Sequence, residues 1–380
     1  MKAPSGRAEG RTGAPTDPAA PRGRLRSVAV PHPLRPARWR TPPARRGAVV
    51  TGSVDSPALR GNPLGDPTRR TLSVWLPPGY EEETERRYPA IYVLPGYGSA
   101  VEEWANRDLF EPTVFERLDT LYASDGAPPP CIHVFLDGAT AYGGSQFVNS
   151  EATGRYEDYV AVDVVAHIDQ NYRTLASPRH RGASGHSSGG IGALALCMRR
   201  PEVFGAAASH AGDALFEHCY GRELGDFARA LQEHGNNVVA LRDRLLGDDA
   251  YRRRHFGPLM VLGCAAAYSP DPDEPLGIGL PVDTWGRVVP ANWERWLAND
   301  PVRMAQRHAD ELRGLRAIYL DAGDSDEYYM DLGARALHET LERLGVEHRY
   351  ERFAGRHGGM SSRYPIGYDH LARALAAATG

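Results

Sequence analysis

The chain has 380 residues, of which 42% are hydrophobic and 24% are charged. These fractions are ordinary for a globular protein, and the length is ample for a large hydrophobic core. They exclude a disulfide-stapled miniprotein, a collagen and a chain that is disordered throughout. The formal net charge of −4 also argues against a nucleic-acid-binding protein, so no nucleic-acid partner is expected.

The net charge is the sum of two unequal parts. Residues 1–46 hold eleven basic and two acidic residues, a net charge of +9, so the rest of the chain carries −13. This tract is rich in proline, arginine and glycine and has almost no hydrophobic periodicity. We therefore expect a disordered basic extension, or a start codon assigned upstream of the true one. Residues 47–380 are expected to form the folded part.

No apolar run reaches the roughly 18 residues needed to span a bilayer, and the first 46 residues lack the apolar core of a secretory signal. The sequence therefore predicts no membrane span and a cytoplasmic location. The four cysteines do not have CxxC spacing, which argues against a zinc or redox site. Cys131 and Cys197 lie in apolar segments and are expected to be buried free thiols.

Candidate strands and helices alternate along the chain. The strands are predicted at residues 71–76, 90–94, 132–136, 181–184, 205–209, 317–320 and 348–353. The helices are predicted at residues 156–172, 190–199, 301–312, 332–344 and 368–377. Because parallel strands need long crossovers, this alternation predicts an α/β fold with a mostly parallel central sheet and helices on both faces.

Residues 213–300 interrupt the alternation and are too long for a plain connection. We expect this segment to be an insertion that covers the C-terminal edge of the sheet as a cap. It contains Trp285, Trp293 and Trp296, which favour an apolar or aromatic group in any substrate, although core packing is the commoner role of such residues.

Residues 185–189 (Gly-His-Ser-Ser-Gly) match the G-x-S-x-G pattern of a nucleophile elbow. A predicted strand precedes the motif and an apolar helix follows it. The two glycines allow the tight backbone approach of a strand that turns abruptly into a helix. The turn would expose the Ser187 hydroxyl above the sheet, which predicts Ser187 as a nucleophile.

A serine nucleophile needs a base, and the base needs an orienting acid. Both residue types follow late predicted strands, where an open parallel sheet places its ligands. His357 follows the strand at residues 348–353 and is the predicted base. Asp326 follows the strand at residues 317–320 and is the predicted acid, with Asp324 as its main rival.

Two backbone N–H groups are candidates for an oxyanion hole. One is that of Ser188, at the start of the predicted helix, and the other is that of Tyr97, in a glycine-rich loop after the strand at residues 90–94. A second glycine-rich loop carries Tyr142, Gln146 and Asn149. These three side chains are candidates for substrate binding or, equally, for loop packing.

Several stretches resemble the esterase D / antigen 85 / enterochelin-esterase group of α/β-hydrolases. They are residues 74–80 (VWLPPGY), residues 88–96 (YPAIYVLPG), residues 185–194 around the serine, residues 321–329 and residues 353–358. The resemblance runs from about residue 60 to residue 375. The histidine loop departs from it, because Arg356 and residues 358–360 (Gly-Gly-Met) replace a Gly-His-Asp-Trp-like run.

The resemblance implies an α/β-hydrolase fold and a Ser187–Asp326–His357 triad, with the Tyr97 and Ser188 amides as the oxyanion hole. It implies hydrolysis of a small-molecule carboxylic ester or thioester through an acyl-enzyme, without a cofactor or a metal. Two alternatives stay open: an acyltransferase that uses an alcohol acceptor, and a non-catalytic binding protein with the hydrolase fold. The oligomeric state is left open.

Overall fold

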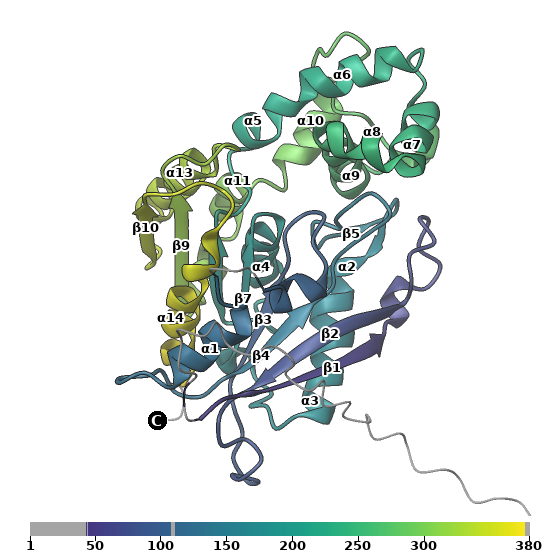
Figure 1. The fold of residues 1–380 in the computed structure, drawn as a ribbon. Coiled ribbons are helices and arrows are strands. Elements are labelled where there is room, and N and C mark those ends of the chain that lie inside the picture. Colours follow the sequence, from purple (N-terminus) through teal and green to yellow (C-terminus); the bar gives the residue numbers. More distant parts are fainter. Residues whose placement is uncertain (1–42, 44, 108–110, 377–380) are drawn as a thin grey trace, which may run out of the picture.

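The structure is a computed structural model that describes residues 43, 45–107 and 111–376 (Figure 1). An eight-stranded sheet with the order β1-β2-β4-β3-β7-β8-β9-β10 forms its centre. The strands are β1 (Ala48–Asp55), β2 (Arg69–Leu76), β3 (Ala90–Leu94), β4 (Ile132–Leu136), β7 (Arg181–His186), β8 (Ala206–His210), β9 (Ala317–Gly323) and β10 (Arg349–Phe353). The last six of these pair in parallel, while β2 is antiparallel to both β1 and β4. The prediction of a mostly parallel sheet is therefore confirmed.

Helices cover both faces of the sheet. The helices are α1 (Val114–Tyr122), α3 (Val165–Asn171), α4 (Ser188–Arg199), α13 (Met330–Arg343) and α14 (Tyr364–Ala376). Ile91 and Val93 of β3 pack in one hydrophobic cluster with α1 and α14. Tyr92 and Leu94 pack in a second cluster with α3, α4 and α13. Alternate side chains of a central strand are thus buried on opposite faces, which explains why the strand is apolar throughout.

Two predicted helices differ in detail from the structure. The helix expected at residues 156–172 contains a π-helical segment, Tyr159–Val164, between α2 (Tyr156–Asp158) and α3. The helix expected at residues 301–312 is broken at His308, which has φ −119° and ψ 31°, into α11 (Pro301–Arg307) and α12 (Ala309–Gly314). The sequence also gave no indication of β1 or of a short ribbon of β5 (Asn149–Ser150) and β6 (Gly154–Arg155).

Between β8 and α11, the chain forms six helices that lie above the C-terminal ends of the strands (Figure 1). They are α5 (Phe216–Cys219), α6 (Leu224–Glu233), α7 (Val238–Gly247), α8 (Asp249–Arg254), α9 (Phe256–Tyr268) and α10 (Pro290–Leu297). Helix α9 is apolar on all sides and is buried between the sheet body and the other cap helices. We call this segment the cap; its treatment as an insertion at residues 213–300 remains a prediction.

The predicted extension at residues 1–46 lies almost entirely outside the described residues, and nothing is concluded from it. Among the helices that the structure describes, none combines the length and the apolarity needed to cross a bilayer. All four cysteines are buried and free, which confirms the expectation for Cys131 and Cys197.

Candidate active site

Ser187 lies at the sharp turn between β7 and α4. Its backbone has φ 55° and ψ −123°, a conformation that residues other than glycine rarely adopt. Hydrogen bonds hold this turn in place: the Ser187 N–H donates to the carbonyl of His210 at 3.0 Å, and its carbonyl accepts from Gly190 N–H at 2.8 Å. The surrounding structure therefore maintains a strained backbone at the residue predicted to be the nucleophile.

The glycines on either side of the turn have no room for a side chain. A Cβ on Gly185 would lie 2.2 Å from the carbonyl oxygen of Gly189, and one on Gly189 would lie 2.1 Å from that of Leu94. Both contacts are with backbone atoms, which cannot move aside without displacing a strand or a helix. The two glycines of the motif are thus needed for the fold of the turn.

Three side chains from three separate loops form a hydrogen-bonded chain. Ser187 Oγ lies 3.1 Å from His357 Nε2, and His357 Nδ1 lies 2.9 Å from Asp326 Oδ2. The Asp326 side chain is fully buried, and its Oδ1 accepts the N–H of Tyr328 at 2.8 Å. The carboxylate is therefore fixed from both sides, and it can hold the imidazole with Nε2 directed at the serine.

Asp324, the rival acid, lies elsewhere. Its exposed carboxylate accepts hydrogen bonds from the Ser325 hydroxyl at 3.2 Å and from Gly355 N–H at 3.3 Å. Of the two candidates, the geometry favours Asp326 as the partner of His357.

His186 is next to Ser187 but faces a different way. Its Nε2 lies 3.1 Å from the backbone carbonyl of His357, to which the neutral ring can donate a hydrogen bond. Burial, together with the neighbouring His357, lowers the pKa of His186 to about 3 and keeps it neutral. His186 therefore anchors the histidine loop and does not compete as the base.

The two predicted oxyanion donors come from loops that meet at Ser187. A Cβ on Gly96 would lie 3.5 Å from Ser187 Cβ, so the loop that carries Tyr97 is adjacent to the serine. Among the described residues, neither the Tyr97 N–H nor the Ser188 N–H has a hydrogen-bond acceptor. The Tyr97 hydroxyl lies against two backbone carbonyls, that of Tyr142 and, at 3.0 Å, that of Leu259 in α9.

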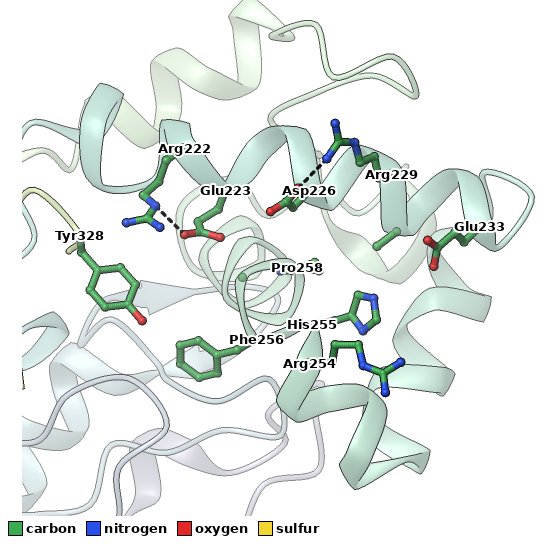
Figure 2. Close-up of a pocket in the computed structure, with 12 residues that line it drawn as sticks. Arg222, Glu223, Asp226, Arg229, Glu233, Arg254, His255, Phe256, Pro258 and Tyr328 are labelled. Atoms are coloured by element: carbon green, nitrogen blue, oxygen red, sulfur yellow. Dashed lines mark hydrogen bonds and ion pairs between the residues drawn. The ribbon is translucent and has the colours of Figure 1, made fainter.

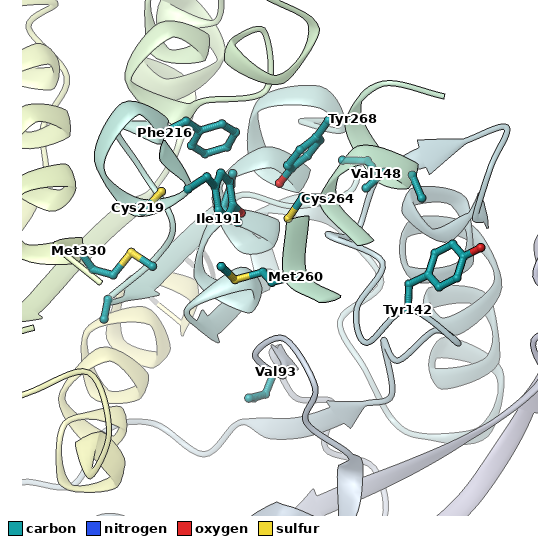
Figure 3. Packing of buried hydrophobic residues seen from close by; sticks show 14 of the residues in the cluster. Val93, Tyr142, Val148, Ile191, Phe216, Cys219, Met260, Cys264, Tyr268 and Met330 are labelled. Atoms are coloured by element: carbon teal, nitrogen blue, oxygen red, sulfur yellow. The ribbon is translucent and has the colours of Figure 1, made fainter. Parts of the chain in front are cut away.

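A cavity of about 170 Å³ opens above Ser187. Part of its lining is Ser187, His357 and the loop that carries Tyr97. The rest is largely apolar and comes from the cap and from the residues around the start of α13. The lining includes Cys219, Tyr220, Phe256, Met260, Tyr328 and Met330. Three of these lining side chains, Cys219, Met260 and Met330, are labelled in the buried cluster of Figure 3. We call this cavity the inner pocket.

A second cavity, of about 380 Å³, lies beside the inner pocket under α6 (Figure 2). Phe256 and Tyr328 line both cavities. The second cavity is highly charged, with Arg222, Glu223, Asp226, Arg229, Glu233 and Arg254 around it. Glu223 lies 3.0 Å from Arg222 and Asp226 lies 3.3 Å from Arg229, so both signs of charge are present. We call it the outer pocket.

The structure also brings Asp213, which was not predicted, to the inner pocket. Its side chain is 2% exposed, and Oδ1 accepts a hydrogen bond from Ser187 Oγ at 3.3 Å. Oδ2 accepts from the Ser188 hydroxyl at 3.0 Å and from the Tyr220 hydroxyl at 2.6 Å. Asp213 follows a parallel strand, β8, as Asp326 and His357 follow theirs, and that position is the signal that could have identified it.

The three candidate substrate contacts, Tyr142, Gln146 and Asn149, lie outside the lining of the inner pocket. Asn149 points to the surface, where its Oδ1 accepts the N–H of Asp158 at 3.1 Å. Tyr142 is buried in the core but does not line the inner pocket. Gln146 lies one layer behind the pocket, with Nε2 3.3 Å from the Tyr220 hydroxyl. These contacts are those of loop packing, the alternative that the sequence left open, and a part in substrate binding stays a prediction.

The cap tryptophans likewise do not line either cavity. Trp296 is fully buried and its Nε1 donates to the Ser269 hydroxyl at 2.9 Å, while Trp285 is 76% exposed. The cap tryptophans therefore give no support to an aromatic substrate group, and that expectation stays a prediction. Within the described part of the chain, no group of three or more His, Cys, Asp or Glu side chains is arranged to hold a metal ion.

Solved structures with the same fold belong to α/β-hydrolase esterases. A ferulic acid esterase covers 87% of this chain and 99% of its own, with a TM-score of 0.57 and 18% identity. A fluorophosphonate-binding serine hydrolase of Staphylococcus aureus covers 87% and 98%, with a TM-score of 0.54 and 14% identity. These likenesses show the α/β-hydrolase fold.

The family model named Esterase matches residues 67–361. The chain belongs to this family, and the resemblance seen in the sequence is confirmed. An endo-1,4-beta-xylanase/feruloyl esterase of Xylanibacter ruminicola is 29% identical over 36% of this chain and 18% of its own length. An esterase of Mycobacterium tuberculosis is 30% identical over 40% of this chain and 30% of its own length. These matches span less than a third of each relative.

Proposed function

We propose that this chain hydrolyses a small carboxylic ester or thioester by acyl transfer through Ser187. The observation that carries the proposal is the hydrogen-bonded chain from Ser187 Oγ to His357 to Asp326, with distances of 3.1 and 2.9 Å. Such a chain connects a nucleophile to a base and the base to an orienting acid. Membership in the Esterase family supports the same chemistry.

In the first half-reaction, Ser187 Oγ attacks the carbonyl carbon while its proton passes to His357 Nε2. Asp326 holds the imidazole with Nδ1–H directed toward its carboxylate and stabilises the imidazolium that forms. The Tyr97 and Ser188 amides donate to the oxyanion, and each such donor contributes roughly 3–4 kcal/mol to transition-state stabilisation. The bond to the leaving group then breaks, and His357 Nε2 returns the proton to the departing oxygen or sulfur.

In the second half-reaction, water attacks the acyl-enzyme. His357 accepts a proton from the water and then donates it to Ser187 Oγ as the acid leaves. The small volume of the inner pocket, about 170 Å³, favours a short acyl group, since pockets for drug-sized ligands are roughly 300–1,000 Å³.

The test is covalent labelling with a fluorophosphonate probe, combined with hydrolysis of p-nitrophenyl butyrate. We expect wild type to be labelled and Ser187→Ala to be neither labelled nor active, with a rate loss of at least about a thousandfold. Ser188→Ala is the matched control, because the proposed role of Ser188 is carried by its backbone N–H; this variant should still be labelled. Labelling of Ser187→Ala would overturn the proposal, and ester formation with an added alcohol in place of acid release would indicate an acyltransferase.

A further inference from the structure

The Ser187 hydroxyl has two acceptors and one proton to give. His357 Nε2 lies 3.1 Å from Ser187 Oγ on one side, and Asp213 Oδ1 lies 3.3 Å from it on the other. The proposed attack requires the proton to go to His357. In the reactive arrangement, Asp213 Oδ1 is therefore left without the serine as a donor.

Acylation prolongs the loss of the hydrogen bond from the Ser187 hydroxyl to Asp213 Oδ1. Once Ser187 Oγ is esterified it carries no proton, so it cannot donate to Asp213 at any time before deacylation. The other carboxylate oxygen is unaffected, since Oδ2 keeps the hydroxyls of Tyr220 and Ser188 at 2.6 and 3.0 Å. A buried carboxylate oxygen without a donor is unfavourable, and a donor from elsewhere would be bound there.

Among the described residues, the Ser187 hydroxyl is the side-chain donor that bonds Asp213 Oδ1. Asp213 is the one carboxylate among the lining residues, and the cap contributes Cys219, whose thiol is only a weak donor, and Met260, which has no donor. The Tyr220 hydroxyl is already committed to Oδ2. The missing donor would therefore come from the bound molecule, whose acyl carbon is bonded directly to Ser187 Oγ.

We propose that Asp213 is a specificity-determining residue that selects short acyl groups bearing a hydroxyl on the second or third carbon. This inference rests on the proposed function, because it concerns the acyl group carried by Ser187. The substituents of these carbons are the substrate atoms nearest to Ser187 Oγ, and hence to Asp213 Oδ1. A hydroxyl suits the site better than an ammonium, since burial raises the pKa of Asp213 and disfavours charge there.

The test compares p-nitrophenyl 3-hydroxybutyrate with p-nitrophenyl butyrate, which differ only in the hydroxyl. Wild type should show a kcat/KM at least about tenfold higher for the hydroxy ester, because a site built to bond a hydroxyl discriminates strongly against its absence. Asp213→Leu removes both acceptor oxygens, so the ratio of the two kcat/KM values should fall to near one. Asp226→Leu, which changes an exposed carboxylate of the outer pocket, is the matched control and should keep the wild-type ratio.

A wild-type ratio near one, or the same high ratio in Asp213→Leu, would overturn the inference. The wild-type ratio is decisive by itself if Asp213→Leu does not fold, as thermal unfolding would show. The proposed function fails separately: in that case neither ester is cleaved and the fluorophosphonate probe does not label Ser187. Rapid cleavage of both esters at equal kcat/KM would retain the esterase and reject only the role of Asp213.

Discussion

His357 Nδ1 lies 2.9 Å from Asp326 Oδ2, and this carboxylate is fully buried at the end of β9. Asp324, two residues earlier in the same loop, bonds to Ser325 and Gly355 at the surface. The same short segment thus holds one carboxylate that can orient the imidazole and one that ties the loop to its neighbour.

We expect Asp326→Asn to lower kcat by about 10⁴-fold, because the amide cannot hold the imidazole in the required tautomer. Asp324→Asn should leave kcat close to that of wild type. Steady-state kinetics with p-nitrophenyl butyrate measure both, and circular dichroism shows whether both variants are folded. A larger loss of kcat in Asp324→Asn would reverse the assignment.

Asp321 lies on β9 itself, before the loop that carries Asp324 and Asp326. We expect its substitution to lower the stability of the fold and to leave kcat unchanged. It is fully buried and accepts hydrogen bonds from His210 at 2.8 Å, Tyr319 at 3.0 Å and Arg363 at 3.0 Å. Burial would raise the pKa of Asp321, but the charges and hydrogen bonds of His210 and Arg363 outweigh it and hold that pKa below its ordinary value.

Because Asp321→Asn breaks a buried ion pair, it should lower the free energy of unfolding by about 3–5 kcal/mol. Urea denaturation measures this loss, and kcat determined well below the melting temperature should stay close to that of wild type. Asp326→Asn is the converse case, with a large loss of kcat and a small change in stability. A fully stable Asp321→Asn would contradict the structural role.

The glycine at the start of α4 offers a third prediction. Gly189→Ala places a Cβ 2.1 Å from the carbonyl oxygen of Leu94, which would displace Ser187. We expect this variant to lower the free energy of unfolding by about 1–3 kcal/mol. Gly225→Ala in α6 is the control, since a Cβ there meets nothing within 4 Å and alanine favours a helix. Thermal unfolding compares the two. Equal melting temperatures would show that the elbow tolerates a side chain.

Much of the sheet could be predicted from local sequence. The runs that form β3 and β4 begin and end where they were expected, because both faces of these strands are buried and every position except His133 is hydrophobic. β1 was missed because it is an edge strand with mostly half-buried side chains, so its sequence resembles a loop. Burial on both faces leaves a clear signal, and burial on one side of an edge strand does not.

The candidate site divides in the same way. The residues that meet in the hydrogen-bonded chain were predictable, since each follows a recognisable strand or lies in the elbow. Asp213 was missed although it follows β8, because its position alone does not reveal the contacts with Ser187 and Tyr220 that the fold creates. Tyr142 and Asn149 were predicted from a glycine-rich loop, but sequence alone does not say which way a loop side chain points.

His133 gives a prediction for the pH dependence of stability. Its side chain is fully buried in β4, packs against Trp75 and Tyr368, and has Nε2 2.9 Å from the Tyr122 hydroxyl. Burial lowers the pKa of His133 to about 3, whereas an unfolded histidine titrates near 6.5. Between these values the unfolded chain binds one more proton than the native protein at this residue. This contribution to stability is therefore full above about pH 6.5 and is lost as the pH falls toward 3, by up to about 1.4 kcal/mol per pH unit.

His133→Phe should make the plot of unfolding free energy against pH less steep by that amount, as urea denaturation between pH 4 and 6.5 would show. His218→Phe, at an exposed position in α5, is the matched control, and a slope that is the same in His133→Phe and wild type would contradict the prediction.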